Sequence, residues 1–93
     1  MWEVVIKRKL LNEIRNLPKA VQAKIELLIE DLKVTGPHLS TWSHYGPLKG
    51  RKDIFHCHIK QGRPTYVATW EIIDKKIKLM EVTYAGTHEK APY

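Results

Sequence analysis

The 93-residue sequence has few of the features that mark secreted or membrane proteins. Cys57 is its only cysteine, so no disulfide can form within the chain, and a reducing compartment is expected. No apolar run approaches the roughly 18 residues that a membrane span requires. The segment from Met1 to Lys9 carries charges at once and lacks the apolar core of a signal peptide. These absences predict a soluble cytoplasmic protein with no membrane partner.

Acidic residues are also in the minority. Ten Asp and Glu stand against sixteen Lys and Arg, which gives a formal net charge of +6. A cationic protein favours polyanionic partners, namely nucleic acid, acidic lipid or an acidic protein. The hydrophobic fraction of 43% is ordinary for a folded chain, and the length suits one domain over residues 1–93.

The first half of the chain predicts a strand followed by two helices. Residues 2–6 are β-branched and aromatic, which is typical of a strand. Apolar residues then recur at helical spacing up to Leu17, where Pro18 forces a break. A second apolar stripe runs from Val21 to Leu32 and is stopped by Gly36. We expect these two helices to form a hairpin.

The second half predicts an irregular connection over residues 36–53 and then three strands. We expect the strands at residues 54–60, 65–73 and 76–84, joined by turns at 61–64 and 74–75. The tail after these strands is too short to predict a further element. The order β-α-α-β-β-β predicts an α+β fold, with an N-terminal strand and a helical hairpin packed on one face of a mostly antiparallel four-stranded sheet.

Side-chain alternation assigns the two faces of the strand at residues 54–60. Phe55, Cys57 and Ile59 share an apolar face that should meet the helices, which makes Cys57 an inert core thiol. His56, His58 and Lys60 share the outward face. If the turns close as expected, the neighbouring strands add the following outward residues: Thr65, Val67, Thr69, Met80 and Tyr84.

Further candidate ligand-binding residues surround that outward face. They are His44, Lys49, Arg51 and Lys52 on the incoming connection and Arg63 at the first turn. Cations bind phosphates and aromatic rings stack on unpaired bases, so this set of residues predicts an RNA-binding site. The alternative for this face is a set of solvated residues, and the Lys and Arg residues of the helices are most simply a solvated face or a docking edge for an acidic partner. Paired strand histidines with His44 could also chelate zinc, but Cys57 faces away and no carboxylate completes the set, so no metal is expected.

Several segments together resemble the RelE branch of the RelE/ParE toxin superfamily. They are Leu48-Lys49-Gly50, the strand His56–Lys60, the strand Tyr66–Asp74, and the tail running from Gly86 to Tyr93. The order of elements matches over nearly the whole chain. His44, His58, His88 and Tyr93 are similar to residues of the YafQ-like toxins. Two positions depart from the pattern: Val67 stands where RelE toxins have an arginine, and Gly62 falls near the carboxylate of the YafQ group.

The resemblance implies the toxin of a type II toxin–antitoxin system. Such a toxin is a metal-independent endoribonuclease that needs no cofactor, cuts messenger RNA, often on the ribosome, and is silenced by a cognate antitoxin. We expect any oligomer to form only through that antitoxin. The implied catalytic residues are His56, His58, His88 and Tyr93.

RNA supplies its own nucleophile, so histidines with a pKa near neutrality can perform both proton transfers. His58 or His56 would act as base and His88 as acid, or the reverse. Lys49, Arg51 and Arg63 would stabilise the phosphate, and Tyr93 would orient the nucleotide. Lys52, Lys60, His44 and Tyr84 complete the candidate RNA-binding set. Two alternatives remain: a toxin of the same fold that acts on DNA gyrase, as in the ParE branch, and a non-catalytic RNA-binding module.

Overall fold

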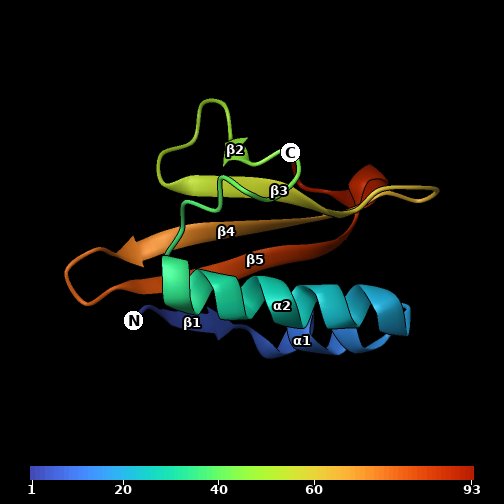
Figure 1. Ribbon diagram of the computed structural model, residues 1–93, viewed down its shortest axis with the longest axis horizontal. Helices are drawn as coiled ribbons and strands as arrows, with labels where there is room; N and C mark the ends of the chain where they lie inside the picture. The colour runs from blue at the N-terminus through green and yellow to red at the C-terminus, as the bar shows by residue number, and fades with distance from the viewer.

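The computed structural model describes all residues from Met1 to Tyr93 (Figure 1). Its elements are β1 (Glu3–Ile6), α1 (Arg8–Arg15), α2 (Lys19–Thr35), β2 (Gly46–Pro47), β3 (Ile54–Lys60), β4 (Tyr66–Asp74), β5 (Leu79–Thr87) and a short 3-10 turn, η1 (His88–Lys90). The expected α+β class is confirmed, and β3 has the predicted bounds. The last strand begins later than predicted, because residues 75–78 form a turn, and it runs on to Thr87 instead of ending at Tyr84.

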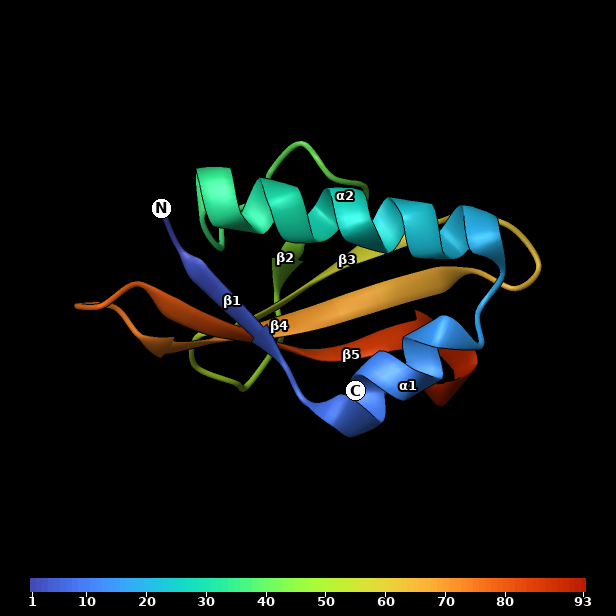
Figure 2. The same cartoon turned by 90° about the horizontal axis from the view of Figure 1, so that it is seen from below.

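The sheet is mixed, with strand order β1-β5-β4-β3-β2. β1 is parallel to β5, and all other neighbours are antiparallel. The sheet contains the four expected strands and one that was not predicted. This additional strand, β2, has two residues and pairs with β3 at the edge of the sheet. Figure 2 shows both helices on one side of the sheet, with α1 against β5 and α2 against β3 and β1. The opposite, outer face is therefore left to the loop before β3 and to the C-terminal tail (Figure 1).

The core lies between the helices and the inner face of the sheet. The predicted stripe of α2 is buried, with Leu28 and Leu32 completely inaccessible. Trp70 at the centre of β4 is also inaccessible, and its indole N–H donates to the Pro37 carbonyl oxygen at 2.9 Å. Cys57 is buried among these residues, as predicted. No helix is both long enough and apolar enough to cross a membrane.

Two irregularities reverse side chains that strict alternation assigned to the outer face. The pairing of β4 with β5 shifts register beyond Thr69, whose partner is Tyr84, while Trp70 pairs with Val82. Thr83 is the extra residue, and its hydroxyl lies 2.7 Å from that of Thr69. An extra residue changes the parity of the strand. Tyr84 therefore faces outward as expected, but Met80 does not: it is fully buried in the core.

The prediction for Lys60 is wrong for the same reason. The register of β3 shifts between His58 and Lys60, so Lys60 pairs with Tyr66, which packs against the helix-side core. Lys60 lines a hollow with Pro18 and Val21 of the helical layer. It is therefore turned away from the face that carries His56 and His58.

Candidate active site

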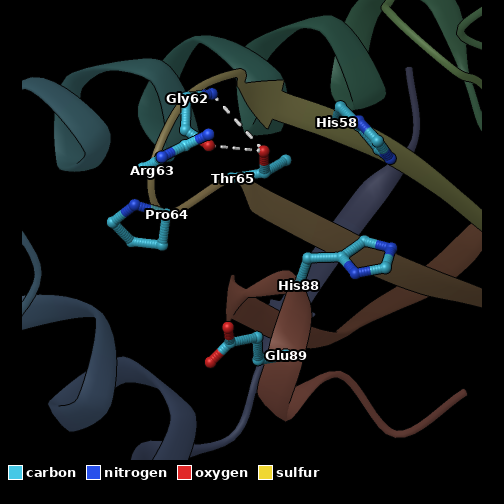
Figure 3. A pocket seen from close by; sticks show the side chains of 7 residues that line it. All are labelled: His58, Gly62, Arg63, Pro64, Thr65, His88 and Glu89. Atoms are coloured by element: carbon cyan, nitrogen blue, oxygen red, sulfur yellow. Dashed lines mark hydrogen bonds between the residues drawn. The ribbon is translucent and has the colours of Figure 1, made fainter.

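An open cleft of about 590 Å³ lies at the end of β3, on the outer face of the sheet. Its lining residues are His58, Gly62, Arg63, Pro64, Thr65, His88 and Glu89 (Figure 3). They come from β3, the turn after it, and η1. The backbone N–H of His88 donates to the Thr65 carbonyl oxygen at 2.8 Å, which fixes the tail against the start of β4. The cleft thus joins residues 58–65 to residues 88–89, which are far apart in the sequence.

Four histidines and the terminal tyrosine form a continuous chain of rings beside this cleft. The rings of His44 and His58 are stacked with centroids 4.0 Å apart, and that of His88 meets His58 edge-on at 5.7 Å. The ring centroid of Tyr93 lies 6.2 Å from that of His88 and 5.2 Å from that of His56. The structure therefore brings together all four residues predicted to be catalytic, together with His44.

A polar network fixes His44 and His58. The side-chain Nε2 of Gln61 lies 3.0 Å from Nδ1 of His58, 3.1 Å from Nδ1 of His44 and 3.1 Å from Oγ of Ser43. The Ser43 hydroxyl is also 2.8 Å from Nδ1 of His44, and the Ser43 carbonyl accepts from the backbone N–H of His58 at 2.7 Å. His44 has a positive φ of 55°, a left-handed conformation that turns its ring towards β3.

The remaining two histidines have different surroundings. Nδ1 of His56 lies 2.9 Å from the carbonyl oxygen of Gly46 in β2. Because a carbonyl only accepts, this nitrogen carries the proton and donates it. The ring of His88 makes no hydrogen bond, so both of its nitrogens are free to meet a ligand.

Burial and neighbouring charge perturb two groups of the ring cluster. Burial lowers the pKa of His58 below its ordinary value of 6.5, the Gln61 contact opposes this shift, and the charges of the adjacent imidazoles add to it, so that the neutral ring is favoured. Burial raises the pKa of Tyr93, so its hydroxyl stays protonated at neutral pH. On the opposite face, burial raises the pKa of the Cys57 thiol to about 12.

The predicted phosphate-binding cations are not all at the cleft. Arg63 lines it, but Lys49, Arg51 and Lys52 do not. They lie in the loop before Ile54, at the other end of β3. Tyr84 also lies away from the cleft, and its hydroxyl donates to the Thr87 carbonyl oxygen at 2.7 Å, bracing the strand end that leads to His88.

Sequence reasoning missed three residues of this region: Ser43, Gln61 and Glu89. Gln61 lies in a turn, where strand alternation no longer predicts the direction of a side chain. Glu89 is the only acidic residue that lines the cleft. The adjacency of Ser43 to His44 was visible in the sequence, but its bond to Gln61 depends on the path of the loop. No group of three His, Cys, Asp or Glu side chains is arranged to hold a metal ion.

Comparison with known proteins supports the architecture. No family model and no curated protein matches the sequence. The isolated RelE toxin of E. coli is 20% identical, with 99% of this chain and 89% of that chain covered and a TM-score of 0.68. The toxin of the E. coli RelBE toxin–antitoxin complex is 22% identical, with coverage of 92% and 95% and a TM-score of 0.65. A chain of the archaeal RelE–RelB complex from Pyrococcus horikoshii is 16% identical, with 97% of this chain and 98% of that chain covered and a TM-score of 0.63. The chain therefore has a RelE-like fold.

Proposed function

We propose that this chain is the toxin of a type II toxin–antitoxin system and that it cleaves messenger RNA without a metal ion. The observation that carries the proposal is the row of imidazoles from His44 through His58 to His88, beside Arg63 in an open cleft. A RelE-like fold is compatible with this chemistry, but the proposal rests on the side chains at the cleft. Imidazoles as a class can transfer protons near neutral pH, and together with a nearby cation they are the groups that RNA cleavage needs.

The reaction requires two proton transfers and one site of charge stabilisation. A base removes the proton of the 2′-hydroxyl, the resulting oxygen attacks the adjacent phosphorus, and the 5′-oxygen leaves with a proton from an acid. His56 or His58 on β3 and His88 in η1 are the proton-transfer candidates, in either order. Arg63 supplies positive charge at the cleft, and the exposed ring of Tyr93 is available to stack on or orient the nucleotide.

The fold comparison also supports a partner. The E. coli structure is described as a toxin–antitoxin complex, and the archaeal one as a RelE–RelB complex. We therefore propose a cognate antitoxin for this chain and messenger RNA, bound to the ribosome, as its substrate. Relief of growth arrest when the neighbouring gene is co-expressed, with formation of a stable complex, would test the partner.

The nuclease is tested by mapping transcript ends after expression, and by incubating purified protein with RNA alone and with translating ribosomes. We expect new 5′ ends with the wild-type chain and a loss of about 10²-fold or more with His58→Ala or His88→Ala. His38→Ala is the matched control, because His38 is the one histidine outside the ring cluster; this variant should cleave as well as the wild type. Intact transcripts in all samples would reject the nuclease, and inhibition of DNA gyrase would then indicate the ParE type of activity.

A further inference from the structure

The amide nitrogen of Gln61 lies within hydrogen-bond distance of a ring nitrogen on two cluster histidines, 3.0 Å from His58 and 3.1 Å from His44. This nitrogen carries two hydrogens and faces three acceptors, the Nδ1 atoms of His58 and His44 and the hydroxyl of Ser43. All three atoms receive a hydrogen bond when both amide hydrogens and the hydroxyl hydrogen of Ser43 are used as donors. The amide donates to His58 and to the Ser43 oxygen, and the Ser43 hydroxyl donates to His44.

His56 is held the opposite way. The Gly46 carbonyl takes a proton from Nδ1 of His56, so the neutral ring has an unprotonated Nε2. On His58 the amide donates to Nδ1, so the neutral ring must carry its proton on Nε2. Two histidines that share one strand face therefore present opposite atoms at the same ring position, an acceptor on His56 and a donor on His58.

We propose that Gln61 is a positioning residue that holds His58 as the neutral Nε2–H tautomer, which makes His58 a hydrogen-bond donor to the phosphate and leaves His56 as the base. The catalytic part of this inference rests on the proposed nuclease function. His56 takes the 2′-hydroxyl proton at Nε2, the 2′-oxygen bonds to phosphorus, and the 5′-oxygen departs with a proton from the imidazolium of His88. His58 keeps its proton throughout and donates a hydrogen bond to a non-bridging phosphate oxygen.

The division of labour follows from the contacts of the three rings. A ring locked in one tautomer by a neutral amide serves one role well, because the other tautomer would break its hydrogen bond. The ring of His88 has no hydrogen bond that fixes either nitrogen, so either nitrogen can face the leaving 5′-oxygen. Holding a catalytic histidine in the wrong tautomer costs orders of magnitude in rate in a well-studied protease triad.

The tautomers can be read directly by nitrogen NMR of histidine-labelled protein at a pH where the rings are neutral. In the wild type we expect His58 protonated on Nε2 and His56 protonated on Nδ1. Gln61→Glu should switch His58 to the Nδ1 proton, because a carboxylate only accepts. Gln61→Leu should leave His58 as a mixture of both forms. His56 is the internal control and should not change in either variant.

Cleavage assays complete the test, with thermal unfolding to confirm that these surface variants fold. We expect a loss of about tenfold for Gln61→Leu and about a hundredfold for Gln61→Glu, with a pH–rate profile displaced in the glutamate variant. A wild-type His58 protonated on Nδ1, or one unaffected by Gln61→Leu, would overturn the assignment. If the tautomers are as expected but wild-type protein leaves RNA intact, the hydrogen-bond assignment stands and the nuclease proposal falls.

Discussion

At the scale of single residues, one strand separates reactive rings from an inert thiol. Cys57 lies between His56 and His58, yet it is completely buried while both rings reach the outer face. The separation follows from strand geometry, because consecutive side chains point to opposite faces. Burial disfavours the charged form of His58 on one face and of Cys57 on the other. His58 is kept neutral and Cys57 is kept protonated.

His58 should make the folded state sensitive to mild acid. Its pKa is lowered in the folded protein by burial and by the nearby imidazoles. As the pH falls through the ordinary histidine value, the unfolded chain binds the proton first, so the free energy of unfolding decreases until the lower folded-state pKa is passed. We expect the free energy of unfolding, measured with urea between about pH 7.5 and pH 5, to fall less steeply with decreasing pH in His58→Gln than in the wild type. Equal slopes would contradict this account.

Cys57 should be chemically silent in the native protein. Alkylation needs the thiolate, and a thiol with a pKa of about 12 has almost none at pH 8. Iodoacetamide should therefore label Cys57 only after unfolding in urea, as followed by mass spectrometry. Cys57→Ala should lower the free energy of unfolding by about 1–2 kcal/mol through lost packing and leave RNA cleavage unchanged. Rapid labelling of the folded chain would show that the thiol is accessible.

At the scale of elements, the sequence predicts the strands and helices well but not where alternation fails. The periodicity of β3 and the stripe of α2 are both found as expected, because each follows from a regular backbone and a buried face. The β-bulge at Thr83 is invisible in the residue pattern and places Met80 in the core. The histidine cluster was partly predictable for the same reason: His56 and His58 lie on a regular strand, whereas Gln61 lies on a turn.

The end of β5 contains a close contact that links this strand to the site. A methyl group on Gly86 would lie 2.8 Å from the hydroxyl oxygen of Tyr84, which donates to the Thr87 carbonyl just before η1. Gly86→Ala should therefore displace the tyrosine, cost about 1–3 kcal/mol of stability and reduce cleavage by disturbing His88.

A double-mutant cycle isolates this contact. Tyr84→Phe removes the atom nearest to the added methyl group, so Gly86→Ala should be less costly in the phenylalanine background than in the wild type. Chemical denaturation of the four proteins gives the coupling energy. An identical cost in both backgrounds would place the strain of Gly86→Ala somewhere other than the Tyr84 ring.

At the scale of the whole molecule, positive charge lies at both ends of β3. Arg63 lines the histidine cleft, while Lys49, Arg51 and Lys52 occupy the loop that enters the strand. From residue 53 to His58 a strand rises by about 17 Å, which is further than one phosphate can bridge. An RNA chain long enough to cross the outer face would meet both sets, whereas a short one held in the cleft would meet only Arg63.

Salt dependence of binding distinguishes the two sets of cations. Each phosphate neutralised on a single strand adds about 0.7 to the magnitude of the slope of log affinity against log salt. With uncleavable 2′-O-methyl oligonucleotides, Arg63→Ala should reduce that slope for short and long chains alike. Combined replacement of Lys49, Arg51 and Lys52 by alanine should reduce it only for long ones. Lys24→Ala, on the exposed side of α2, is the matched control and should not change the slope. If the loop variant weakened the binding of a dinucleotide as much as that of a long chain, RNA would bind around the loop rather than at the histidine cleft.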